Sequence, residues 1–215
     1  LSGEAAPVLA RYQGEAGQKR SSYLLAIAAD VQAHVNQVHK DWETYEVDFI
    51  THDGTDAGSS ASELYNHFVQ SHESLKNDKV GLPAGLRAGQ TGTEPTRVEA
   101  YYSGISVALI RAQVEATARI WSGKGINGIE GQGFADYLEE VEGGPALVAD
   151  TKAQLAALTA ALDALPEGRL SELVNSHPAE VALLFTELQK LTRFYKSDMS
   201  SLLGISITFA SGDGD

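Results

Sequence analysis

The segment Leu24–Phe49, LLAIAADVQAHVNQVHKDWETYEVDF, carries the clearest structural signal in the chain. Its large apolar residues recur in alternating steps of three and four, at Leu24, Ile27, Val31, Val35, Val38, Trp42, Tyr45 and Phe49. This spacing places them all on one face of a single α-helix. About thirty residues of helix would form a rod roughly 45 Å long. The fold is therefore expected to contain long amphipathic helices.

The same periodicity recurs in four later segments. After a turn at Asp53–Gly58, a second helix is expected to begin at Ser59 or Ser60 and to turn Leu64, Phe68 and Leu75 inward. Further long helices are expected to begin at Ser106, after Gly143 and at Pro178, with a short helix over residues 134–141. Ile205, Ile207 and Phe209 alternate at the period of a strand. The pattern predicts an all-α fold, an up-and-down helical bundle.

Residues 80–102 break this pattern. Their glycines and prolines argue against a regular helix, at Gly81, Pro83, Gly85, Gly89, Gly92 and Pro95. Loops of this length inside a domain are uncommon and are usually functional or flexible. Leu82, Leu86 and Val98 lie within the segment and favour a packed loop. Any sub-domain boundary is expected within residues 80–102.

The charge balance excludes some partners. The 215 residues contain 29 acidic and 16 basic side chains, for a net charge of −13. Phosphate backbones and anionic membrane surfaces require clustered Lys and Arg, so we expect no nucleic-acid partner. A cation, or a partner with a basic patch, is easier to accommodate. Cysteine is absent, which excludes thiolate metal ligands, and no apolar run reaches the roughly 20 residues of a transmembrane helix.

Four motif regions, in chain order, resemble the imelysin family of bacterial envelope proteins. They are Lys19–Leu24 (KRSSYL), Gly54–Ser60 (GTDAGSS), Lys79–Gly89 (KVGLPAGLRAG) with Glu99–Gly104 (EAYYSG), and the ending Ile205–Asp215 (ISITFASGDGD). The resemblance is closest to imelysin-like proteins of the Bacteroidetes type. It implies that residues 1–215 are the later part of a longer protein whose N-terminal helical region is missing. It further implies export to the periplasm or cell envelope, with a lipid anchor on the full-length protein.

Two classes of function follow from the resemblance. The first is a non-enzymatic envelope binding protein, linked to uptake of iron, of another metal or of a small anionic ligand. The alternative is the metallopeptidase activity associated with a Gly-x-His-x-x-Glu motif. The nearest match here is Asn175–Glu180, which lacks the Gly. We expect the binding class, with the peptidase alternative requiring a metal motif upstream of Leu1; a divalent metal or iron in the full-length protein stays open.

The histidines offer several metal ligands with a simpler alternative for each. His177 and Glu180 lie at a helix start, where capping explains both. Two pairs are spaced i,i+4, His39 with Glu43 and Glu63 with His67, and either could hold part of a metal site or be solvated polar residues. Asp213 and Asp215 resemble the start of a calcium loop, but a solvated acidic tail explains them as well. We therefore assign no metal ligand.

The strongest candidate for ligand binding surrounds the irregular loop. Its polar residues fall at loop or helix-terminal positions, within the segments that carry the resemblance: Asp56, Ser60, Arg87, Tyr102 and Ser103, with Gly58 beside them. Helix N-termini present free N–H groups, and Arg87 could clamp a carboxylate. The alternative is that Asp56 and the serines cap helices while Arg87 braces a turn. We expect Arg87 to lie close to Asp56, Ser60 or Ser103, and Lys76 to lie on an exposed face.

Overall fold

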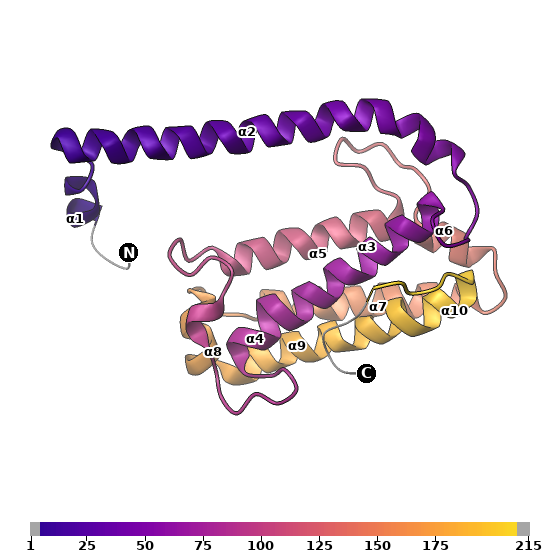
Figure 1. Cartoon of the computed structure of the whole chain (residues 1–215). Helices are drawn as coiled ribbons and strands as arrows, with labels where there is room; N and C mark the ends of the chain where they lie inside the picture. Colours follow the sequence, from indigo (N-terminus) through magenta and orange to yellow (C-terminus); the bar gives the residue numbers. More distant parts are fainter. Residues whose placement is uncertain (1–4, 210–215) are drawn as a thin grey trace. The chain divides into compact units, whose positions relative to one another are not determined.

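The structure, a computed structural model, describes residues 5–209 (Figure 1). Helices dominate it and no strand occurs in residues 5–209, which confirms the all-α fold class. The chain separates into two compact units, Leu1–Asp53 and Gly54–Asp215. The boundary expected within residues 80–102 therefore falls inside the second unit. No helix in the described part of the chain is both long and apolar enough to cross a bilayer.

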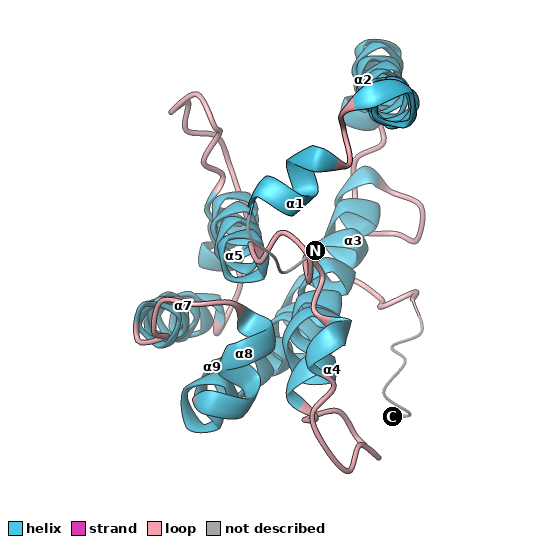
Figure 2. Cartoon of the chain, turned by 90° about the vertical axis from the view of Figure 1, so that its left-hand side faces the viewer, coloured by secondary structure: helices cyan, strands magenta, loops and turns pink. Residues whose placement is uncertain are grey.

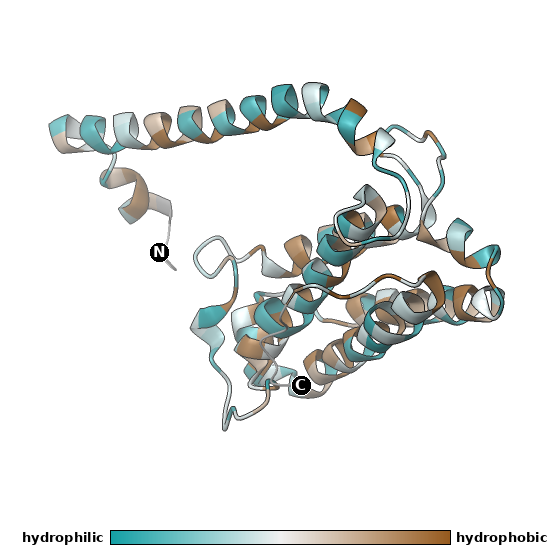
Figure 3. Ribbon diagram, turned by 45° about the vertical axis from the view of Figure 1, so that its right-hand side comes forward, coloured by the Kyte–Doolittle hydropathy of each residue, from teal (hydrophilic) through white to brown (hydrophobic). Residues whose placement is uncertain are grey.

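The first unit holds α1 (Ala5–Ala10) and α2 (Gly14–Thr51). At 38 residues α2 is longer than the sequence pattern predicts, and its rod measures about 57 Å. Apolar residues recur along it as expected (Figure 3). Within α2 only Gly17 is buried, and stripe residues such as Val38 are exposed. The helical periodicity is thus confirmed, and the stripe residues before Phe49, which share one face, lie at exposed positions.

The second unit is a bundle of four long helices that alternate in direction (Figure 1). They are α3 (Ser60–Ser74), α5 (Ser106–Ser122), α7 (Gly144–Asp163) and α9 (Pro178–Arg193). Figure 2 shows them almost end-on around a shared interior. The short helices α6 (Phe134–Glu139) and α8 (Leu170–Ser176) link them. The helix starts predicted at Ser106 and Pro178 are confirmed.

Aromatic and leucine side chains fill the core of the bundle. Phe68 contacts the rings of both Phe134 and Tyr195, with centroids 5.4 and 4.7 Å apart. Tyr65 is fully buried, and its hydroxyl donates to the backbone carbonyl of Tyr195. Leu64 is 40% exposed, so the prediction that it faces inward is wrong. Tyr65, one residue later, takes the inward position instead.

The helical run that begins with α3 continues further than the sequence suggests. It passes through a π-helical turn, η1 (Leu75–Gly81), and then through α4 (Leu82–Ala84). The expectation that Gly81 and Pro83 exclude a helix is therefore wrong. Pro83 is the second residue of α4, directly after the π-helical turn. Gly85, with φ of +71°, ends the run.

The loop that follows is folded back on itself, with a 3₁₀ turn, η2 (Pro95–Arg97), near its end. A side chain at Gly85 would collide with the backbone of Gly92, so these two positions of the loop are in close contact. Val98 is buried, whereas Leu86 is 37% exposed. The predicted packing of this loop is thus supported at Val98 and only partly at Leu86.

A second π-helical turn follows α9. This turn, η3 (Phe194–Met199), leads into α10 (Ser200–Leu203) and then into an extended segment. Ile205, Ile207 and Phe209 pack toward the core, as their alternation predicts. Asn66 binds the backbone of this segment twice, by donating to Ser206 O at 3.0 Å and accepting from Thr208 N at 2.7 Å. Asp213 and Asp215 lie outside the described residues.

Candidate functional site

A pocket of about 580 Å³ opens in the second unit at its two π-helical turns. Its lining comes from the end of α3, η1, the loop after α4, the later turns of α9, and η3. A π-turn widens a helix by one residue and is rare in proteins, where it often marks a functional site. Two such turns at one pocket are therefore a structural reason to place a ligand there. A volume of this size is typical of small-molecule sites.

Cationic side chains dominate the charge of the lining. Among the described residues that line the pocket, four are cationic and one is a carboxylate: Lys76, Arg87, Arg193, Lys196 and Glu73. The whole chain carries a net charge of −13, so this local excess runs against the composition. Such a concentration of positive charge in a concave site attracts anions.

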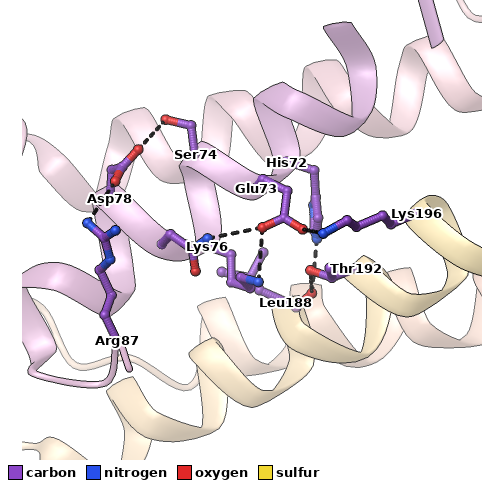
Figure 4. Close-up of polar contacts among 10 residues, drawn as sticks. His72, Glu73, Ser74, Lys76, Asp78, Arg87, Leu188, Thr192 and Lys196 are labelled. Carbon is purple, nitrogen blue, oxygen red and sulfur yellow. Dashed lines mark hydrogen bonds and ion pairs between the residues drawn. The ribbon is translucent and has the colours of Figure 1, made fainter. Parts of the chain in front are cut away.

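Glu73 forms ion pairs with two lysines that line the pocket, Lys76 and Lys196 (Figure 4). Its Oε2 lies 3.1 Å from Lys76 Nζ and accepts a hydrogen bond of 3.0 Å from Asn77 Nδ2. Its Oε1 lies 3.8 Å from Lys196 Nζ and is buried without a hydrogen bond. The Glu73 and Lys76 side chains are only 7% and 4% exposed. Charges that are buried this deeply are tolerated because each compensates the other.

Two arginines stand at the edge of the pocket, each with a carboxylate partner from outside the lining. Arg87 Nη1 lies 3.3 Å from Asp78 Oδ1, and Ser74 Oγ donates to the other oxygen of Asp78 at 3.0 Å (Figure 4). Arg193 Nε lies 3.5 Å from Asp198 Oδ2. The Arg193 side chain is 76% exposed, so its ion pair is weak and can exchange for a ligand.

Three apolar residues also line the pocket: Phe185 from α9, with Leu86 and Ala88 from the loop after α4. Apart from the charged residues, the rest of the lining is polar and uncharged, at Asn77, Gln189, Thr192 and Ser197. The Phe185 ring lies directly over Gly81, because a Cβ added at Gly81 would come within 2.7 Å of Phe185 Cε2. The same Cβ would come within 3.3 Å of Arg87 Cγ. Gly81 thus leaves the space in which the ring and the arginine stem sit side by side.

His72 lies next to Glu73 in the chain but belongs to the core. Its Nε2 donates to Leu188 O at 2.9 Å, and its ring packs edge-to-face on Tyr195 at 5.1 Å. Burial, opposed by the Leu188 hydrogen bond and assisted by the charge of Lys76, lowers the pKa of His72 to about 4. His72 is therefore neutral near pH 7 and is not an additional cation at the pocket.

The five residues predicted to bind a ligand do not form one cluster. Asp56 and Ser60 lie at the start of α3, whereas Arg87 follows the end of α4. The helical run over residues 60–84 separates these ends by about 35 Å. The expected proximity of Arg87 to Asp56 or Ser60 is therefore wrong, and Arg87 pairs with Asp78 instead. Of the five, only Arg87 lines the pocket.

The other two members of that set lie before α5. Tyr102 is 67% exposed and contacts the Tyr101 ring at 5.3 Å. Ser103 Oγ donates to Ala100 O at 3.4 Å. Ser60 is buried at the start of α3, and the neighbouring Ser59 supplies the cap by accepting from Ser62 N at 3.3 Å. A ligand-binding role for Asp56, Ser60, Tyr102 and Ser103 stays a prediction.

The histidine pairs are not among the described residues that line this pocket. His39 Nδ1 is 3.3 Å from Glu43 Oε1, with both side chains largely exposed, as solvated surface residues would be. His177 occupies the N-cap of α9 without a side-chain cap bond, and Ser176 Oγ donates to Glu172 O, so the predicted side-chain cap is wrong. Within residues 5–209, no three His, Asp or Glu side chains come together as a metal site would require.

The central residues of the pocket, Glu73 and Lys76, were missed by the sequence analysis. A signal for them exists, because Phe68, His72 and Lys76 follow one another at i,i+4 on the buried face of the helix. Polar residues at such inward positions must find buried partners. His72 finds Leu188 and Lys76 finds Glu73.

Comparison with known proteins identifies one relationship. The model of the Imelysin family, peptidase M75, matches residues 7–194, which is most of the chain. No curated protein and no solved structure matches it.

Proposed function

Because the chain belongs to the imelysin family, and because its pocket concentrates positive charge, we propose that it is a non-enzymatic binding protein that captures a small anionic ligand. The observation that carries the proposal is the lining of four cations and one carboxylate in a chain of net charge −13. The resemblance to envelope proteins extends the proposal to a periplasmic, lipid-anchored protein that takes part in iron or other nutrient uptake.

The arrangement of the cations supports capture rather than chemistry. Lys76 and Lys196 are held by Glu73, so their ammonium groups are positioned before a ligand arrives. Fixed cations cost a ligand less ordering entropy than mobile ones. Arg193 and Arg87 each form an ion pair with a carboxylate at the edge of the pocket. A carboxylate or phosphate of the ligand could replace that carboxylate and accept hydrogen bonds from the guanidinium N–H groups.

Isothermal titration calorimetry of the purified chain with inorganic phosphate, citrate and 3-phenylpropionate tests the proposal. At least one of these anions should bind with a stoichiometry of one, and added NaCl should weaken that binding. Arg193→Ala and Lys196→Ala should each reduce the affinity by roughly tenfold, as expected for a lost charge-assisted hydrogen bond. Lys152→Ala, which removes an exposed lysine on α7, is the matched control and should change nothing.

Two results would contradict the proposal. One is that no anion binds, or that binding survives both Arg193→Ala and Lys196→Ala. The other is chelator-sensitive cleavage of insulin chains by the purified chain, which would support the peptidase alternative.

A further inference from the structure

The pocket lining includes four cations (the cationic wall) and the apolar residues Phe185, Leu86 and Ala88 (the apolar wall). On the basis of the proposed function we infer that its ligand is a carboxylate with an apolar body about the size of a phenyl ring. A compact inorganic anion or a polyacid would satisfy the cationic wall and leave the apolar wall exposed. The class follows from three features of the lining, namely the fixed ring of Phe185, the position of the cations, and the volume.

The apolar wall is preformed. The Phe185 ring rests on Gly81, where no side chain can displace it, and Leu86 and Ala88 line the same pocket from the loop after α4. Leu86 is 37% exposed although the loop around it is folded back on itself. An exposed apolar side chain beside a fixed aromatic ring is what a ring-bearing ligand would cover.

The two lysines paired with Glu73 come from the two π-helical turns, and not from α9 or the loop after α4. Lys76 belongs to η1 and Lys196 to η3, and both are oriented by Glu73 at the base of the pocket. Arg87 lies between the two walls, since its Cγ lies beside Gly81 and Phe185 while its guanidinium pairs with Asp78. A carboxylate on the lysine side and an apolar group against Phe185 would use both walls at once.

The volume favours the same class. The pocket measures about 580 Å³. A tetrahedral oxyanion is equivalent to only a few water molecules of about 30 Å³ each, so it would leave most of this space hydrated. An aryl or short alkyl body would replace that water at the apolar wall and would be favoured by burial of its surface.

The test compares ligands that share one head group, by isothermal titration calorimetry on the purified chain. 3-Phenylpropionate should bind at least about tenfold more tightly than acetate, which presents the same carboxylate without the ring. Phe185→Ala and Leu86→Ala should each reduce this ratio severalfold. Leu183→Ala removes an exposed leucine of α9 that does not line the pocket, and it should leave the ratio unchanged.

Phe185 is partly buried, so Leu86→Ala, at a more exposed position, keeps the test valid if Phe185→Ala fails to fold. Equal affinity for 3-phenylpropionate and acetate would overturn the inference, as would a ratio that both variants leave intact. Phosphate or citrate binding more tightly than 3-phenylpropionate would overturn it while leaving the proposed anion binding in place. Absence of binding by every anion would instead refute the proposed function.

Discussion

Glu73 and Lys76, one helical turn apart, form an ion pair of 3.1 Å with side chains only 7% and 4% exposed. The pair lies where α3 passes into the π-helical turn η1. Removing one partner from such a pair leaves an uncompensated charge in a low-dielectric environment. The pair therefore links the stability of the bundle to the positive charge of the pocket.

Glu73→Ala should lower the free energy of unfolding by about 3–5 kcal/mol, because Lys76 loses its buried counter-charge. The double variant Glu73→Leu with Lys76→Met should recover much of this loss, since neither charge then remains. Urea denaturation monitored by circular dichroism measures both effects. Glu115→Gln, at an exposed position of α5, should stay within about 0.5 kcal/mol of the unchanged protein. A Glu73→Ala protein as stable as this control would show that the pair contributes nothing.

His72 should make the stability depend on pH. Burial lowers its pKa in the folded state from 6.5 to about 4, so between these values the unfolded state binds more protons. The free energy of unfolding should therefore fall as the pH falls from 6.5 toward 4, by about 3 kcal/mol in total from this group. The contribution is fully present above pH 6.5. His72→Gln should flatten this slope in urea denaturation series, whereas His67→Gln, on the exposed side of α3, should retain it.

Gly81 should not tolerate a side chain. A Cβ there would lie 2.7 Å from Phe185 Cε2 and 3.0 Å from the Lys76 carbonyl oxygen. Gly81→Ala should therefore destabilise the protein by about 1–3 kcal/mol, the usual cost of overpacking. Gly92→Ala is the comparison, because no atom lies within 4 Å of its added Cβ. Thermal or urea unfolding should show Gly92→Ala as neutral or slightly stabilising; similar losses in the two variants would contradict the close approach of Phe185.

Asn66 should hold the extended segment against the bundle. It donates to Ser206 O and accepts from Thr208 N, so Asn66→Ala removes both hydrogen bonds to this segment, and a third to Ser62 O, at a buried position. The expected loss is about 1–3 kcal/mol. Hydrogen exchange should show the Thr208 amide exchanging roughly tenfold faster in the variant, while amides in α7 remain protected. Unchanged exchange at Thr208 would mean that the segment is retained by Ile205 and Ile207 alone.

Local signals account for the parts of the fold that the sequence predicts correctly. Pro178 at the first turn of α9 and Ser59 at the start of α3 act through the backbone next to them, and the helical periodicity of α2 depends only on spacing. The alternation of Ile205, Ile207 and Phe209 likewise requires no knowledge of distant residues. These features were predictable because each is settled within a few residues of chain.

The candidate site depended on contacts that the sequence does not show. Gly81 and Pro83 would normally end a helix, yet the helix continues through both, and Phe185, a hundred residues later, packs onto Gly81. That continuation carries Arg87 away from Ser60 and places it at the pocket. Lys76 was expected on an exposed face, and Glu73 is what permits its burial. In the sequence, the burial of Lys76 is indicated only by the i,i+4 spacing of His72 and Lys76 on the inward face of the helix.

The two π-helical turns affect how this chain can change in length. Each α-helical residue advances the helix by about 100°, so an extra residue rotates every side chain beyond it to a new direction. Lys76 lies inside the first wide turn and Lys196 inside the second. Loss of one codon in either turn would restore an ordinary helix and move one lysine off the pocket. The same deletion would leave the preceding part of α3 or α9 in register, so a change of one residue in length would alter the cationic lining of the pocket and spare the helix before it.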